Sequence, residues 1–157
     1  YGLPLAQVKE FKLNVLPRFL EAPARLLKTS NDTDANLESY QKIKATEIYD
    51  NELGQFKTSE CLDEMSVEIG RARAFTKGWL ERESNFLHMN YKFLLGLLKS
   101  GMYNEFYEEI KTNLVCFMDP NVYGRSILEN SSFIAPTCNP DPMVHGKGSS
   151  LVYQALP

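Results

Sequence analysis

Residues 79–101 read WLERESNFLHMNYKFLLGLLKSG, and this stretch decides the fold. Its apolar residues recur every three or four positions, which is the spacing of one face of an α-helix. They are Leu80, Leu87, Tyr91, Leu94, Leu95 and Leu98. Gly101 follows them, and glycine commonly ends a helix. The pattern predicts a helix that begins near Leu80 and stops before Gly101.

A second apolar stripe follows within a few residues of Gly101. It comprises Phe106, Tyr107, Ile110, Leu114 and Phe117. Its acidic start suits the positive end of a helix dipole. Because the break between the two stripes is short, the sequence predicts an antiparallel helix hairpin.

The N-terminal part of the chain also has helical spacing. Leu5, Val8, Phe11 and Val15 predict a helix that Pro17 interrupts. Residues 31–34 contain good N-cap candidates for a further, rather polar helix. The chain as a whole is therefore expected to be mainly α.

The composition changes after Met118. Five of the eight prolines and three of the nine glycines lie in residues 119–157, and helical periodicity is weak there. Tyr123, Ile127 and Phe133 are too apolar for a disordered tail. This region is expected to be a long, ordered loop segment.

Composition and charge exclude several classes of function. The formal net charge is -3, whereas a nucleic-acid-binding surface needs a basic face. No apolar run approaches the roughly 18 residues that span a bilayer. The three cysteines fit neither a disulfide framework nor a zinc site, which favours reduced thiols and a cytoplasmic protein. No cofactor or metal motif is present, so none is expected.

Two polar clusters are candidate sites. On a helix that begins near Leu80, Glu81 and His88 would lie about two turns apart on one face. They could form a polyol site, or they could be an ordinary charged helix start in which Arg82 pairs with a carboxylate. The second cluster lies in residues 125–132, where Arg, Asn and Ser could hold a phosphate or simply form turns.

Four segments together resemble a known family. They read LPRFLEAPARLLK, IYDNELGQFKTS, EIGRARAFTKGWLERESNFLHMNYKFLLGLLKSGMYNEF and MDPNVYGRSILENSSFI. They are similar to the C-terminal portion of the catalytic domain of bacterial cellobiose-phosphorylase-type enzymes, which are inverting glycoside phosphorylases. The resemblance covers residues 3–148 and is most specific in residues 68–132.

The resemblance implies a particular fold. Residues 1–157 would be a single partial domain, part of an (α/α)6 toroid with four to five helices and a long ordered C-terminal loop segment. Residues 1–118 would be helical and residues 119–148 would form a loop-rich active-site segment. The tail, residues 149–157, matches nothing in the family.

The resemblance also implies site residues. Glu81 and His88 match a family motif that lines the acceptor-sugar subsite, and Arg82 lies between them. The family usually has Asn-Gly-Gly where Arg82, Glu83 and Ser84 stand, so the acceptor would differ. The implied phosphate-binding residues are Arg125, Asn130, Ser131 and Ser132.

The implied reaction is phosphorolysis of a β-glucoside, with inorganic phosphate as co-substrate and a sugar 1-phosphate as product. The family's aspartate general acid has no counterpart here, so no catalytic residue is assigned and the isolated chain is expected to be inactive. The expected partners are an oligosaccharide, phosphate and, through self-association or a longer chain, further protein. The alternative is a non-enzymatic helical module that binds sugars or proteins.

Overall fold

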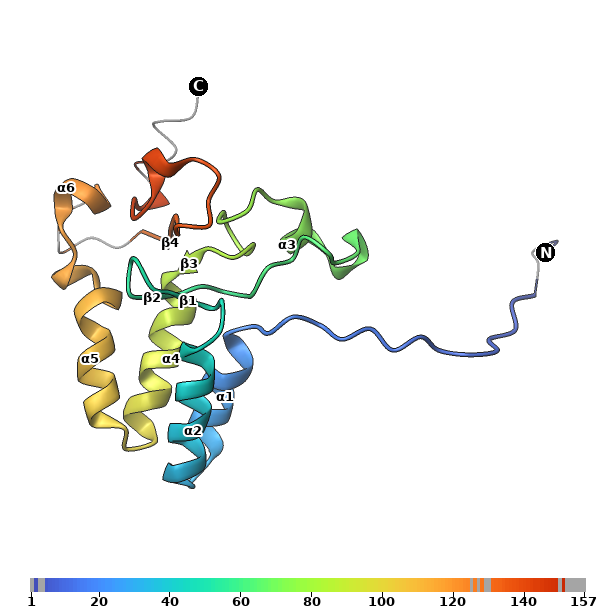
Figure 1. Cartoon of the computed structure of the whole chain (residues 1–157), viewed down its shortest axis with the longest axis horizontal. Coiled ribbons are helices and arrows are strands. Elements are labelled where there is room, and N and C mark those ends of the chain that lie inside the picture. The colour runs from blue at the N-terminus through green and yellow to red at the C-terminus, as the bar shows by residue number, and fades with distance from the viewer. Residues whose placement is uncertain are drawn as a thin grey trace.

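The computed structural model describes residues 2, 5–124, 126, 128, 131–149 and 151. Its body consists of four helices: α1 (Glu21–Thr29), α2 (Thr33–Lys44), α4 (Leu87–Lys99) and α5 (Tyr103–Asn113). Helix α1 packs against α2 and α4, and α4 packs against α5 (Figure 1). Two single-turn helices, α3 (Arg71–Ala74) and α6 (Pro120–Tyr123), lie in the connections. The expected mainly α class is confirmed.

The four longer helices form two antiparallel hairpins. The α1–α2 turn ends with Asp32, whose carboxylate caps α2 by accepting from Ala35 N at 3.0 Å. The α4–α5 turn contains Gly101 at φ +79°, which confirms the hairpin predicted there. Both short turns lie at one end of the helices, and the long segments after α2 and α5, residues 45–86 and the described part of residues 114–151, lie at the other (Figure 1).

Two small antiparallel strand pairs order this loop-rich end. Strand β1 (Tyr49–Asp50) pairs with β2 (Gln55–Phe56), and β3 (Asn85–Phe86) pairs with β4 (Phe133–Ile134). The second pair ties the segment after α5 to the start of α4. Three short 3-10 helices complete the connections: η1 (Val67–Ile69), η2 (Val115–Phe117) and η3 (Pro142–Val144).

The main core lies between the helices and the β1–β2 hairpin. Its fully buried members include Leu20, Leu27, Ile48, Phe56, Phe93 and Leu97. Buried amides join the same elements, because Asn85 Nδ2 donates to Gln55 Oε1 at 2.7 Å and Gln55 Nε2 donates to the Thr112 carbonyl at 2.8 Å. These bonds fix strands β2 and β3 above α5.

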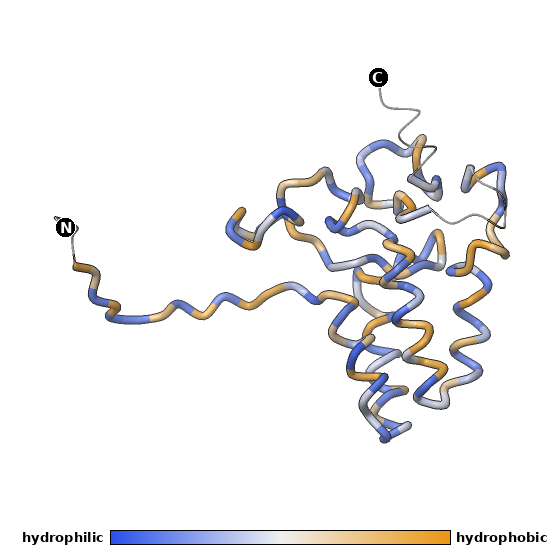
Figure 2. Tube along the Cα trace, turned by 180° about the vertical axis from the view of Figure 1, so that it is seen from behind, coloured by the Kyte–Doolittle hydropathy of each residue, from blue (hydrophilic) through white to orange (hydrophobic). Residues whose placement is uncertain are grey.

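The predicted N-terminal helix is wrong. Residues 5–18 have no helix, and the segment runs as an extended arm away from the body (Figures 1 and 2). Its apolar side chains are uncovered, with Leu5 98% and Phe11 90% exposed. A short helix needs to bury its apolar face, and the apolar side chains of the arm stay exposed.

The predicted start of the central helix is also wrong. Helix α4 begins at Leu87, and residues 79–84 form a tight turn in which Leu80 and Glu83 have φ of +49° and +59°. Thr58 N donates to the Ser84 carbonyl at 2.8 Å, which holds the turn against the segment after β2. Tertiary contacts therefore override the helical pattern, and Glu81 and His88 do not share a helix face.

Within the described part of the chain, no helix has both the length and the apolar character needed to cross a membrane.

Candidate functional site

A polar cavity of about 400 Å³ opens at the loop-rich end. Its walls come from the β1–β2 turn, the segment after β2, residues 77–83 and residues 137–138. The buried part carries Asp50, Lys57 and Glu83, while Glu47 and Glu52 are exposed at the rim. Carboxylate and ammonium groups therefore both line the cavity, and its volume is within the roughly 300–1,000 Å³ range of small-molecule sites.

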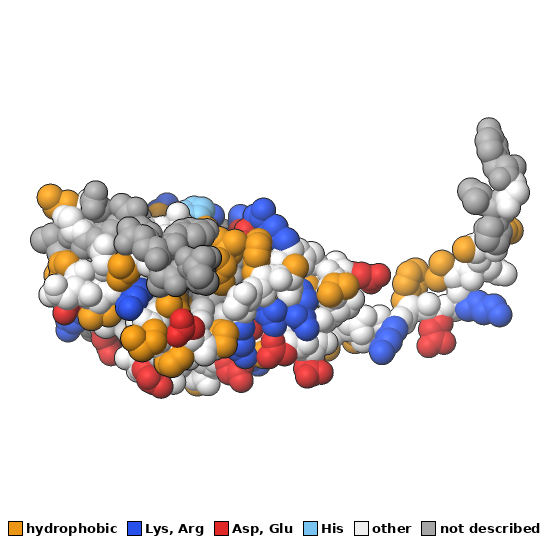
Figure 3. Space-filling view, turned by 90° about the horizontal axis from the view of Figure 1, so that it is seen from above, with side chains coloured by type: hydrophobic (Ala, Val, Ile, Leu, Met, Phe, Trp, Pro, Cys, Tyr) orange, Lys and Arg blue, Asp and Glu red, His pale blue; other side chains and the backbone are white. Residues whose placement is uncertain are grey.

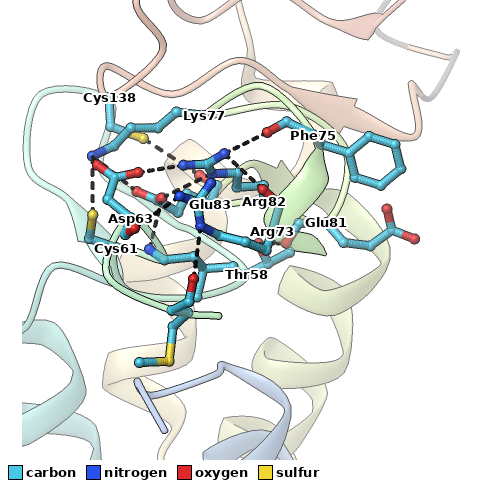
Figure 4. A network of polar contacts seen from close by, with 12 residues as sticks. Thr58, Cys61, Asp63, Arg73, Phe75, Lys77, Glu81, Arg82, Glu83 and Cys138 are labelled. Atoms are coloured by element: carbon cyan, nitrogen blue, oxygen red, sulfur yellow. Dashed lines mark hydrogen bonds and ion pairs between the residues drawn. The ribbon is translucent and has the colours of Figure 1, made fainter. Parts of the chain in front are cut away.

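Glu83 lies at the centre of a polar network beside this cavity (Figure 4). The residue is 1% exposed, yet it has a positive φ of +59°, which is unusual for glutamate. Its carboxylate accepts from Leu62 N at 3.2 Å, and it pairs with Lys77 Nζ at 3.5 Å and Arg82 Nε at 3.8 Å. A buried charge in a strained backbone conformation marks a position that the surrounding structure holds in place.

Arg82 holds the turn together. Its guanidinium donates to the carbonyls of Arg73 at 3.0 Å and Phe75 at 2.8 Å, and it also pairs with the Asp63 carboxylate. The side chain is only 11% exposed. The guanidinium therefore links residues 63–75 to the turn at residues 79–84.

Lys77 joins three potential metal ligands. Its ammonium lies 3.4 Å from Cys61 Sγ, 3.4 Å from Asp63 Oδ2 and 3.5 Å from Glu83 Oε2. The ligand atoms of those three residues lie within 4.8 Å of one another, a spacing that could hold a metal ion. Because the ammonium already contacts all three, a cation would have to displace Lys77.

The same contacts shift the pKa values of Asp63 and Lys77. Hydrogen bonds from Cys61 and Arg82 lower the pKa of Asp63 to about 2. Burial lowers the pKa of Lys77, but its contacts with Cys61 and Glu83 outweigh this and leave its pKa above the ordinary value. Both groups are therefore charged at neutral pH.

Asp50 and Cys138 form the opposite wall. The Asp50 carboxylate is fully used, because it accepts from the backbone amides of Glu52 and Leu53, both at 3.2 Å, and from Thr137 N at 2.7 Å and Thr137 Oγ1 at 3.1 Å. The Cys138 thiol donates to the Glu83 carbonyl at 3.7 Å. Burial raises the pKa of Cys138 to about 11.

Lys57 is the second lysine on the cavity wall, after Lys77. The residue is 7% exposed and lines the cavity, and its backbone N–H donates to the Ile48 carbonyl at 2.6 Å. Within the residues that the structure describes, no hydrogen bond or ion pair involves its ammonium group. The Lys57 nitrogen is not among the fully buried atoms without a partner, so it reaches the solvent of the cavity and is available to a ligand.

The predicted sugar-binding residues, Glu81, Arg82 and His88, do not share one site in the structure. Glu81 pairs with the exposed Arg71 and points away from the Glu83 network (Figure 4). Arg82 is the structural brace described above. His88 is exposed near the start of α4 and does not line the 400 Å³ cavity.

Part of the predicted phosphate site does lie near His88. Ser131 and Ser132 line a second pocket of about 320 Å³ together with His88, Phe86 and Tyr91. The Ser131 hydroxyl is buried and has no hydrogen-bond partner in the described residues. The other two predicted phosphate ligands, Arg125 and Asn130, lie outside the residues that the structure describes.

Few features of the sequence point to the residues of the cavity. Asp50 and Lys57 lie far from Thr137 in the chain, and all three stand in segments without a motif. Glu83 has a positive φ, which glycine adopts easily and glutamate rarely, and no local pattern in the sequence predicts it.

Comparisons with known proteins leave the resemblance as a prediction. No protein-family model matches the chain, and a search of curated proteins finds no match either.

Proposed function

We propose that this chain is the sugar-binding part of a carbohydrate-active protein of the glycoside phosphorylase type, and that the 400 Å³ cavity receives the sugar. The observation that carries the proposal is the composition of the cavity. The exposed carboxylates of Glu47 and Glu52 and the ammonium group of Lys57 line a space open to solvent. A sugar presents hydroxyl groups that both donate and accept hydrogen bonds, so it matches such a wall.

The arrangement of helices supports the same proposal. Two antiparallel hairpins carry their long connections at one end, and the cavity lies in those connections. An (α/α)6 toroid is built from repeated hairpins of this kind, so we propose that the four longer helices form one sector of it. The free thiols of Cys61, Cys116 and Cys138 support a reducing, cytoplasmic environment.

We propose a binding role, and no catalytic role, for this chain. Phosphorolysis of a β-glucoside would require a general acid that the sequence does not supply, so we assign no catalytic residue. The roles predicted for His88, Ser131 and Ser132 stay predictions, with inorganic phosphate as the co-substrate that their pocket would hold.

Saturation-transfer NMR with glucose and cellobiose tests the proposal. We expect both sugars to bind the wild-type chain, and we expect Cys138→Phe, which places a ring at the cavity wall, to abolish binding. Cys116→Phe is the matched control, because Cys116 is exposed and lies outside the cavity. A wild-type chain that binds neither sugar, or a folded Cys138→Phe variant that binds them unchanged, would rule out this cavity as the sugar site.

A further inference from the structure

A basic face lies along the seam between α1 and α4. On α4, Lys92, Leu95 and Lys99 follow one another at helical spacing, so they form one stripe. On α1, Arg25 and Lys28 form a second stripe in the same way. Arg25 and Lys99 are exposed, and Lys28 and Lys92 are half-buried. The whole chain has a net charge of -3, so this local excess of cations is opposite to its overall charge.

The two helices pack closely enough to make the stripes one surface. A side-chain carbon at Gly96 of α4 would lie 3.1 Å from Leu27 Cβ and 3.3 Å from the carbonyl oxygen of Ala24, both on α1. Glycine, which has no side chain, therefore permits this close approach of the two backbones. The stripe of α4 and the stripe of α1 consequently flank a narrow seam.

The cations of this face outnumber the anions beside them. Glu21 pairs with Arg25 at 2.6 Å. Among the residues that the structure describes, no ion pair or hydrogen bond involves the ammonium groups of Lys28, Lys92 and Lys99. Burial, and then the charges of Lys92, Lys99 and Arg25, lower the pKa of Lys28, so the like charges act on one another across the seam. An anionic partner would relieve this repulsion.

We propose that this face binds an acidic amphipathic helix of a partner protein. Carboxylates on one face of a helix recur at the same interval of three to four residues as the cations here, so a helix along the seam can pair with both stripes. Leu95 is 42% exposed between Lys92 and Lys99. An apolar side chain between the partner's carboxylates would cover it.

Other anionic partners match the face less well. The two stripes contain no Phe, Tyr or Trp on which nucleic-acid bases could stack, and Glu21 would repel a phosphate. Helices that bind anionic membranes present a broad apolar face, whereas Leu95 is the one apolar member of these stripes. The arm of a second copy does not match either, because it carries Lys9 and Lys12 against Glu10.

Fluorescence anisotropy of a labelled peptide tests the proposal. The peptide has three repeats of Glu-Glu-Ala-Leu-Ala-Glu-Ala, which place Glu and Leu on one helix face, and the control peptide has Gln for every Glu. We expect the full chain to bind the acidic peptide roughly tenfold more tightly, and added salt to weaken this binding. Lys92→Gln with Lys99→Gln should weaken it about fivefold or more. Lys42→Gln with Lys111→Gln removes the same charge from α2 and α5 and should change little.

Further measurements separate an acidic helix from other polyanions. Leu95→Ser should weaken peptide binding about threefold, because the covering apolar contact is lost. In the wild-type chain, the acidic peptide should shift the backbone amide signals of Lys28 and Lys92 and leave that of Lys111 unchanged. Equal affinity for the acidic and control peptides, or unchanged binding by the folded Lys92 and Lys99 double variant, would overturn the proposal. Tighter binding of oligo(dT) or of phosphatidylserine vesicles through the same two lysines would overturn it in favour of a nucleic acid or a membrane.

Discussion

At the scale of single residues, Lys57 lines the cavity, and no hydrogen bond or ion pair joins its ammonium group to another described residue. Natural cores pair their buried charges, and removing one partner of a pair is destabilising. Lys57 has no such partner among the described residues, so its replacement should not break a structural pair. We therefore expect Lys57→Met to raise or preserve the melting midpoint, measured by calorimetry without ligand. A marked loss of stability would show that the ammonium group has a structural role.

Asp63 predicts how stability depends on pH. Its pKa is lowered from 3.8 to about 2 by hydrogen bonds from Cys61 and Arg82. A carboxyl group with a lowered folded-state pKa stabilises the fold above its unfolded pKa, and that contribution is lost as the pH falls through the folded value. The free energy of unfolding should therefore drop between about pH 4 and pH 2, and Asp63→Asn should flatten this part of the curve.

Chemical denaturation at several pH values measures this effect, with Asp34→Asn as an exposed control. Because the Asp63 side chain is 46% exposed, solvent screening keeps its contribution modest. The same steep slope in wild type and Asp63→Asn would contradict the assignment.

The cysteines differ in the reactivity expected from their surroundings. Burial raises the pKa of Cys138 to about 11, whereas Cys116 is exposed. Because the thiolate is the reactive form, iodoacetamide near neutral pH should modify Cys116 well before Cys138. Peptide mass mapping over time gives the order, and unfolding in urea should remove the difference. Rapid labelling of Cys138 in the folded chain would argue against a closed cavity wall.

At the scale of elements, a buried ion pair joins α2 to α5. Glu109 is 2% exposed, and its carboxylate accepts from Tyr40 Oη at 2.5 Å and from Lys44 Nζ at 2.7 Å. Removing one partner of a buried pair costs about 3–5 kcal/mol. Glu109→Ala should therefore lower the free energy of unfolding by roughly that amount, as urea denaturation would measure.

The neighbouring Glu108 provides the control for this pair. It contacts the same Lys44 at 3.4 Å, but its side chain is 65% exposed. Exposed pairs contribute about 0–1 kcal/mol, so Glu108→Ala should cost far less than Glu109→Ala. Similar costs for the two variants would contradict the proposed anchoring of α5 by Glu109.

The sequence predicted elements well where local pattern and tertiary contacts agree. The α4–α5 hairpin follows from an apolar stripe, a glycine and a second stripe, and Gly101 adopts the expected left-handed conformation. The stripe could not predict that α4 begins at Leu87. Residues 79–84 are held in a turn by Thr58 and Arg82, and such long-range contacts leave no mark on local periodicity.

The candidate site was less predictable than the helices. Its wall combines residues from positions 47–61, 77–83 and 137–138, which only the folded chain brings together. Glu81 was predicted to bind sugar in part because charged residues cluster around it in the sequence. In the structure, its carboxylate pairs with Arg71. Lys57 stands in an unremarkable stretch, and only the folded chain places it on the cavity wall.

At the scale of the whole molecule, the body and the N-terminal arm differ in how far their apolar side chains are buried. The helices enclose a continuous core, whereas the arm exposes its apolar residues to solvent (Figures 2 and 3). Leu5, Val8 and Phe11 are 98%, 66% and 90% exposed. Uncovered apolar side chains that lie close together usually mark a surface that contacts another protein.

We therefore expect the chain to self-associate through its arm. Deleting residues 1–12 should reduce association, because it removes these three apolar side chains and retains the contacts between Arg18 and Glu60 that hold the start of the body. The melting midpoint should hardly change, since side chains that are exposed contribute little to folding. Sedimentation velocity over a range of concentrations measures the association. A wild-type chain that stays monomeric at high concentration would contradict self-association, and an unchanged oligomer after the deletion would show that the helical body, not the arm, provides the contact.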